Sequence, residues 1–169
     1  MLKFVFLLLV LSAFMSCQQA NKPCSFGNPT AIFDKNMSFI KNHNYEIKQN
    51  KSAERLELPE FNLSLEIFQS GCDTVQQEFK LILNGSLQEI QTATQLAELI
   101  ADIFAAISEL DKEKLAQFMN MAQSVGNNSA QFAFGQALIL STAEQNLSFS
   151  INIIRQANQT IIGLTQILS

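Results

Sequence analysis

The chain holds few residues whose chemistry could serve catalysis, and a single histidine is the first of them. A serine or cysteine triad needs a histidine as its general base, and His43 is the one histidine available. It lies in a stretch rich in Asn and Lys, with no nucleophile motif beside it. We therefore expect an ordinary solvated histidine, and the sequence assigns no catalytic residue.

Pairs of carboxylates are the remaining option for catalysis. Glycosidases need only two acids held about 5 to 9 Å apart. Glu57 with Glu60, or Glu66 with Glu78, could be placed in that way. Such acids are more commonly solvated charges on the polar side of a strand. A hydrolase is therefore the least favoured of the functional hypotheses.

Other site types find little support in the composition. Zinc needs three or four His, Cys or acidic ligands at a recognisable spacing, and a calcium loop needs clustered acids. The six glycines form no phosphate-binding loop. Beyond residue 16 the formal charge is −5, whereas a nucleic-acid surface is basic. We expect no metal, no cofactor and no nucleic-acid partner.

A long apolar run opens the chain. Residues 1–16 combine a positive charge at Lys3, an apolar stretch over residues 4–11 and small residues near the end. These are the three parts of an export signal. The run is shorter than the roughly 20 apolar residues of a transmembrane helix. The sequence therefore predicts a signal peptide over residues 1–16.

Four residues at the end of this run, Phe14, Met15, Ser16 and Cys17, resemble the acylation and cleavage site of bacterial lipoproteins, with Phe14 replacing the usual leucine. The resemblance implies cleavage before Cys17, a diacylglycerol on its sulfur, and acyl chains such as palmitate holding the protein on a membrane. It also implies the outer membrane, because no aspartate follows Cys17 to retain the protein in the inner membrane. The alternative is an ordinary secretory signal, with Cys17 in a disulfide and a secreted or soluble periplasmic protein.

The three cysteines leave an odd one in an oxidising compartment. Lipidation of Cys17 would remove it and leave Cys24 and Cys72 as one pair. A disulfide between them would stabilise the fold by about 4 kcal/mol in the chain-entropy model. The alternative is two unpaired thiols.

Composition divides the remaining chain into two parts. Residues 17–44 are rich in Asn, Lys, Gln and Ser and contain Pro23 and Pro29. We interpret them as a lipid anchor and tether with a partly ordered lead-in, which could form a short helical turn near residues 32–40. Residues 45–169 are long enough for a single domain.

Alternation of apolar and polar residues predicts a β-hairpin early in this domain. Residues 63–68 and 75–83 both alternate, and Ser70, Gly71 and Cys72 form a turn between them. An earlier strand is expected at residues 45–49 or 55–58, and Pro59 must lie outside any central strand.

Helical spacing replaces the alternation after this hairpin. Ser86 and Glu89 form a capping-box pattern that predicts a helix start, followed by a broad apolar face up to Ile107. A second helix is expected from Asp111 to Gly126, which is a good terminator. A third, apolar on nearly all sides, is expected over residues 130–142.

The last segment decides the fold class. Alternation over residues 147–153 and a β-branched run at residues 160–162 favour a C-terminal β-hairpin, because Asn and Ser weaken a helix interior. We therefore expect an α+β domain, in which one layer of two to three helices packs on a mostly antiparallel sheet. The alternative is a helical C-terminal segment in a mostly α bundle with an N-terminal hairpin.

These expectations favour a lipid-anchored interaction protein of the cell envelope. Its partners would be the membrane, through Cys17, and another envelope protein. The class includes inhibitor, immunity and accessory proteins. A carrier or sensor of an apolar ligand and an envelope hydrolase using paired carboxylates are the alternatives.

Overall fold

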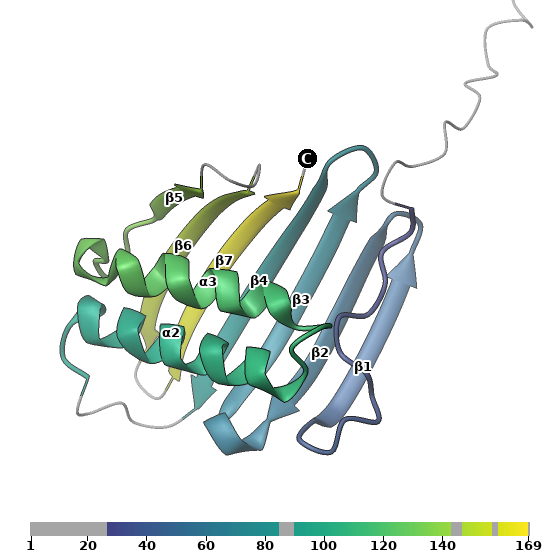
Figure 1. The fold of residues 1–169 in the computed structure, drawn as a ribbon, viewed down its shortest axis with the longest axis horizontal. Helices are drawn as coiled ribbons and strands as arrows, with labels where there is room; N and C mark the ends of the chain where they lie inside the picture. Colours follow the sequence, from purple (N-terminus) through teal and green to yellow (C-terminus); the bar gives the residue numbers. More distant parts are fainter. Residues whose placement is uncertain (1–26, 85–89, 143–146, 157–158, 169) are drawn as a thin grey trace, which may run out of the picture.

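Seven antiparallel strands form one sheet, and two helices pack on one of its faces (Figure 1). This computed structural model describes residues 27–84, 90–142, 147–156 and 159–168. The strand order is β1-β2-β3-β4-β7-β6-β5. The expected α+β class is confirmed, with a larger sheet than the two hairpins predicted. The strands are β1 (Lys41–Lys48), β2 (Lys51–Leu58), β3 (Leu63–Gly71), β4 (Val75–Asn84), β5 (Leu138–Thr142), β6 (Leu147–Gln156) and β7 (Gln159–Leu168).

The predicted hairpin is formed by β3 and β4. Leu65 lies opposite Leu81 and Ile67 opposite Phe79, and all four side chains are buried. The two options for an earlier strand are both realised, as β1 and β2. Pro59 lies between strands, in the short 3-10 helix η1 (Pro59–Phe61), where its missing N–H costs no ladder hydrogen bond.

The C-terminal segment is a hairpin of β6 and β7, and the helical alternative is wrong. Ile153 lies opposite Ile162, and both are buried against the helices. Their neighbours Ile154 and Ile161 face the other way. A period of two places the β-branched side chains on both faces of a pleated strand.

The expected third helix over residues 130–142 is wrong. A short 3-10 turn, η2 (Ser129–Gln131), is followed by a loop and by strand β5. Gly135 adopts a φ of 71°, which ends any helix, and its N–H donates to the carbonyl oxygen of Ile153. The apolar residues of the expected helix are divided between the loop, which holds Phe132 and Phe134, and strand β5, where Leu140 is buried and Ile139 exposed.

Helix α2 (Ala93–Leu110) begins later than expected. Thr92 and Gln95 form its capping box, in which each side chain bonds the other residue's backbone N–H. Ile90 precedes the helix, and the predicted capping pair Ser86 and Glu89 lies outside the described residues. The broad apolar face is buried as expected, against both the sheet and α3.

Helix α3 (Ala116–Asn127) also begins after its predicted start at Asp111. The Asp111 side chain accepts from the Lys114 N–H, and its carbonyl accepts from the Leu115 N–H. These bonds form a tight turn ahead of the helix. Gly126 lies one residue before the helix end, close to the predicted terminator.

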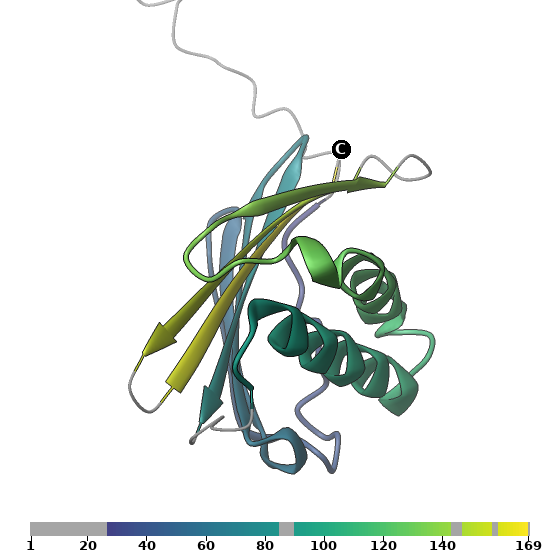
Figure 2. The same ribbon diagram turned by 90° about the vertical axis from the view of Figure 1, so that its left-hand side faces the viewer.

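Aromatic rings fill the space between the helices and the sheet. The Phe118 ring of α3 lies 5.7 Å from Phe33, 5.8 Å from Phe79 and 5.7 Å from Phe104, measured between ring centroids. All four rings are buried. Figure 2 shows both helices on the same side of the sheet. The hydrophobic core therefore lies between this helix layer and one face of the sheet.

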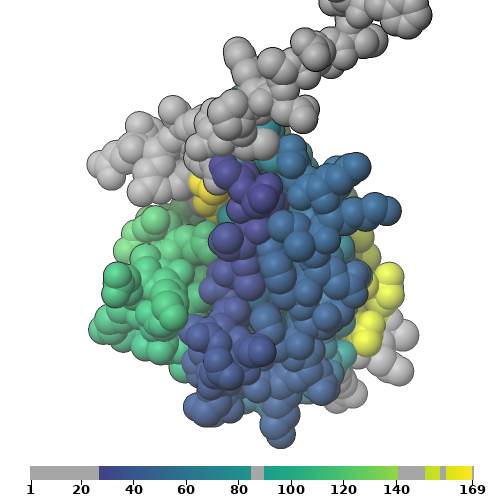
Figure 3. Space-filling view, turned by 90° about the vertical axis from the view of Figure 1, so that its right-hand side faces the viewer, coloured from purple at the N-terminus to yellow at the C-terminus, as the bar shows by residue number. Residues whose placement is uncertain are grey.

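Residues 27–40, called here the lead-in segment, belong to the folded unit. Phe33 and Ile40 are buried in the core, and the expected domain boundary at residue 45 falls inside β1. Reverse turns closed by bonds from Met37 N–H to Asp34 and from Ile40 N–H to Met37 replace the expected helical turn. Figure 3 shows this segment, in purple, between the helices and β1–β2.

Candidate functional site

The carboxylates Glu66 and Glu78 do not lie directly opposite each other on the hairpin of β3 and β4. Glu66 on β3 lies opposite Lys80 of β4, and Phe68 lies opposite Glu78. The Glu66 carboxylate is 3.1 Å from the Lys80 Nζ and 3.7 Å from the Arg55 Nε. Two cations therefore flank Glu66, which is engaged in salt bridges rather than in the pair of acids that glycoside hydrolysis needs.

The pair Glu57 and Glu60 is equally unsuited to catalysis. Glu57 accepts a 2.8 Å hydrogen bond from the Asn42 side chain on β1, and both acids are exposed. Catalytic acids of this kind depend on a shielded environment that separates their pKa values. Among the described residues, no three His, Cys, Asp or Glu side chains form a group able to hold a metal ion.

The three cysteines are the residues for which the sequence made its most specific predictions. Cys17 and Cys24 lie outside the described residues. Cys72 is partly buried in the turn between β3 and β4, where it was expected. Lipidation of Cys17 and the Cys24–Cys72 disulfide stay predictions.

His43 is not the solvated histidine that the sequence suggested. It lies on β1 with its side chain 10% exposed, and its Nε2 is 2.7 Å from Oε1 of Glu54 on β2. The Glu54 side chain is fully buried. The register of β1 is irregular between Lys41 and Asn44, and Asn42 has a φ of 52°. Around this irregularity Asn44 is exposed while His43 points inward.

Glu54 joins the lead-in segment to the sheet. Its Oε2 accepts a 2.8 Å bond from the Ile32 N–H, and its Oε1 accepts a 3.0 Å bond from the Phe33 N–H. With His43, three donors surround one buried carboxylate, which is the condition under which such burial is tolerated. The sequence does contain an indication of this site. Glu54 alternates with Ser52 and Leu56 on the side of β2 that faces the core, and all three are buried.

A row of buried polar side chains makes a second connection to the lead-in segment. Gln69 donates a 2.8 Å bond to the Thr30 carbonyl oxygen and accepts a 3.0 Å bond from Gln77. Ser52 and Gln166 continue this row on the neighbouring strands. Sequence reasoning missed the row, because each glutamine looked like a single polar interruption of a strand.

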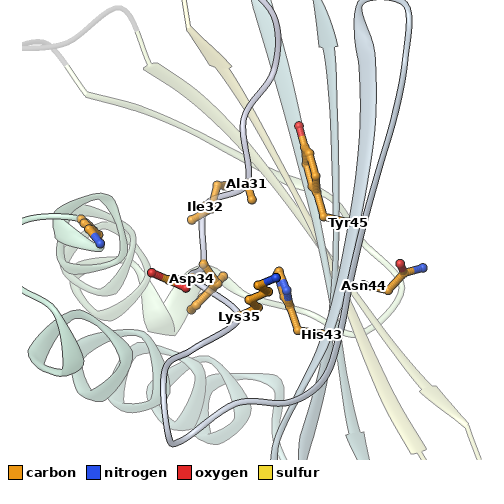
Figure 4. Close-up of a pocket in the computed structure, with 9 residues that line it drawn as sticks. Ala31, Ile32, Asp34, Lys35, His43, Asn44 and Tyr45 are labelled. Atoms are coloured by element: carbon orange, nitrogen blue, oxygen red, sulfur yellow. The ribbon is translucent and has the colours of Figure 1, made fainter.

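A pocket of about 540 Å³ opens beside His43 and Glu54, between the lead-in segment and β1 (Figure 4). Asn44 points away from it, and the Tyr45 hydroxyl donates to the Pro29 carbonyl oxygen. The Asn36 N–H bonds the Asp34 carboxylate at 2.9 Å and holds the pKa of Asp34 below its usual value. The lining residues are Ala31, Ile32, Phe33, Asp34, Lys35, His43, Asn44, Tyr45 and Lys114.

The sheet face opposite the helices, called here the open face, carries apolar side chains on β4, β7, β6 and β5. Ile82, Ile161 and Ile154 lie side by side in register across three strands. Ile139, Ile154 and Ile167 are 72%, 44% and 38% exposed. No described element covers this face. The three C-terminal strands contribute no charged side chain to it, since Arg155 lies in the phase of the inward-facing Ile153.

The described helices lack the combination of length and apolar character needed to cross a bilayer. Comparison with family models, curated proteins and solved structures found no match.

Proposed function

We propose that this protein is anchored by lipid in the bacterial cell envelope and binds a protein partner through its open face. The protein would act as an inhibitor, immunity or accessory protein, and its partner would be the envelope protein that it recognises. Secretion or a soluble periplasmic form is the alternative location.

The observation that carries this proposal is the open face itself. Isolated exposed apolar residues are common, but a contiguous apolar area on a monomer often marks a binding surface. Here Ile82, Ile161 and Ile154 adjoin one another in register. Ile167 is a separate exposed position on the same face, beyond Gly163 and Thr165 of β7, and Ile139 is another on β5, opposite Ser150. A sheet surface that no described element covers suits a protein better than a small molecule, which favours a concave site.

The anchor would leave this face accessible. Seven residues lead from Cys17 to Cys24, and each spans at most about 3.5 Å. A disulfide adds about 5.5 Å between its two Cα atoms, so a Cys24–Cys72 bond would keep the turn between β3 and β4 within about 30 Å of the lipidated Cys17. With that end of the sheet nearest the membrane, the open face would be available to proteins in the same compartment.

The packed core weighs against the carrier hypothesis. A carrier of an apolar ligand needs a cavity of several hundred Å³ lined by apolar side chains. The space between helices and sheet is instead occupied by Phe118 and its three neighbouring rings. The hydrolase hypothesis is disfavoured by the salt bridges of Glu66 and by the exposure of Glu57 and Glu60.

Site-specific photo-crosslinking in intact cells tests the proposal. A photoreactive residue at Ile154 should give a discrete adduct, and one at the exposed Glu98 of α2 should not. The captured protein would then be purified and its affinity measured directly. Ile167→Lys should weaken binding by about tenfold or more, whereas Ile47→Lys on β1, which is 50% exposed, should not. Equal affinity for all three proteins, or adducts from Glu98 alone, would refute the proposal.

A further inference from the structure

The pocket beside His43 is lined by charged and polar side chains that have no role in the proposed function. Its side chains come from three separate places, because Lys35 belongs to the lead-in segment, His43 to β1, and Lys114 to the turn before α3. These elements are held together by the Glu54 hydrogen bonds and by the Phe33 and Phe118 rings. The pocket therefore exists only in the folded protein, where these three elements meet.

His43 is fixed in one orientation. An ionised carboxylate only accepts hydrogen bonds, so the Nε2 that lies 2.7 Å from Glu54 carries a proton directed at it. Nδ1 is then the ring nitrogen left for a ligand. Nδ1 can donate a hydrogen bond to an anion only when it carries a proton as well.

The acids around the pocket accept hydrogen bonds from protein groups, whereas its two lysines form no salt bridge with them. Asp34 is bonded by both the backbone and the side chain of Asn36, and Glu54 by three donors. Neither Lys35 nor Lys114 forms an ion pair with any residue that the structure describes. Both Asn36 bonds fall on Oδ1 of Asp34, so its Oδ2 is still an acceptor. Figure 4 shows the Asp34 carboxylate directed away from Lys35 and His43, so near these two residues the Lys35 ammonium is the charged group left to bind a ligand.

We propose that this pocket binds a small organic anion. Its carboxylate or phosphate group would lie between Lys35 and His43, which Figure 4 shows directed to the same part of the pocket. Its apolar body would contact Ile32 and the ring of Tyr45, whose hydroxyl is already engaged by Pro29. A volume of about 540 Å³ exceeds what an inorganic ion needs and lies in the range of small-molecule sites.

The single histidine makes a direct test available, because its ring gives one set of imidazole resonances. The full chain after signal removal would be titrated at fixed pH with phenyl phosphate, inorganic phosphate and acetate, with sodium chloride at matched ionic strength as the reference. Phenyl phosphate should shift the His43 resonances saturably and bind several-fold more tightly than inorganic phosphate. Sodium chloride should give only a small linear drift.

Two lysine variants separate a site from general charge attraction. Lys35→Gln should weaken phenyl phosphate binding by about tenfold, since a charge-assisted bond to the anion is lost. Lys48→Gln, an exposed lysine on the same strand as His43 but outside the pocket, should leave it unchanged. Both variants should unfold at the wild-type temperature, because neither side chain is buried.

Shifts that never saturate, or equal losses in the two variants, would overturn the proposal. Equal affinity for phenyl phosphate and inorganic phosphate would overturn the part that assigns an organic body to the ligand. Anion binding in this pocket does not depend on the open face. The Ile167→Lys variant, which should bind its protein partner weakly, should therefore bind phenyl phosphate with wild-type affinity.

Discussion

Oε1 of Glu54 lies 2.7 Å from Nε2 of His43, and the carboxylate is fully buried. The same carboxylate binds the backbone of Ile32 and Phe33. The Glu54 side chain of β2 therefore fixes the His43 ring on β1 and also holds the lead-in segment against the sheet.

We expect Glu54→Gln to destabilise the fold by about 3 kcal/mol, because breaking a buried pair leaves donors without an acceptor. The amide keeps one oxygen but turns an NH₂ group toward donors that the carboxylate accepted from. Urea unfolding would measure the loss. Glu57→Gln, on the same strand but exposed, should change the free energy of unfolding by less than about 0.5 kcal/mol. Equal stability of the two variants would contradict this account of Glu54.

The aromatic cluster predicts a second large effect. Phe118→Ala should lower the free energy of unfolding by about 3 to 5 kcal/mol, because it leaves a cavity among the three neighbouring rings. Phe134→Ala is the matched control, since Phe134 is 36% exposed and its ring contact is with Arg155. Chemical denaturation would measure the free energy of unfolding of both variants. If Phe118→Ala lost no more of it than Phe134→Ala, the core would not be close-packed.

The parts of this fold that the sequence predicted are those with a strong local signal. Period-two alternation around Gly71 identified β3 and β4, and the same pattern with β-branched residues identified β6 and β7. Strand β5 was misread as a helix because the short apolar run at Leu138 lacks a clear period. Its pairing with β6 is a tertiary contact that no local window contains.

Helix starts and the site were missed for a related reason. Thr92 with Gln95 fits the same capping pattern as Ser86 with Glu89, so the pattern alone does not choose between them. His43 and Glu54 are eleven residues apart and meet only because β1 and β2 pair. Burial of a polar residue depends on such pairing, which the sequence does not display.

The turn between β3 and β4 predicts a strict requirement for glycine. Gly71 has a φ of 124°, and a Cβ there would lie 1.9 Å from the Thr74 carbonyl oxygen. Gly71→Ala should therefore destabilise the fold by about 2 kcal/mol or more. Gly163→Ala on β7 should have little effect, because its Cβ would meet no atom closer than 4.0 Å. Thermal unfolding of the two variants tests this, and similar transition temperatures would show that the turn relaxes freely.

The expected disulfide makes a redox-dependent prediction. Cys24→Ser should lower the free energy of unfolding by about 4 kcal/mol without reductant, and Cys17→Ser should leave it unchanged. Adding reductant should destabilise the wild-type domain by the same amount and leave Cys24→Ser unaffected. A reductant effect that persists in Cys24→Ser would exclude the Cys24–Cys72 pairing.

Lipidation of Cys17 determines where the molecule lies, so it predicts both a mass and a location. The intact mass of protein purified from membranes should correspond to a chain starting at Cys17 plus acyl chains. Cys17→Ser should move the protein to the soluble fraction, because one or more acyl chains are lost and the remaining chain has no other expected membrane contact. Cys72→Ser is the control, since it removes a cysteine of the folded domain without touching the anchor. An unacylated mass, or a Cys17→Ser protein that stays with the membrane, would instead favour an ordinary secretory signal and direct the search for partners to secreted proteins.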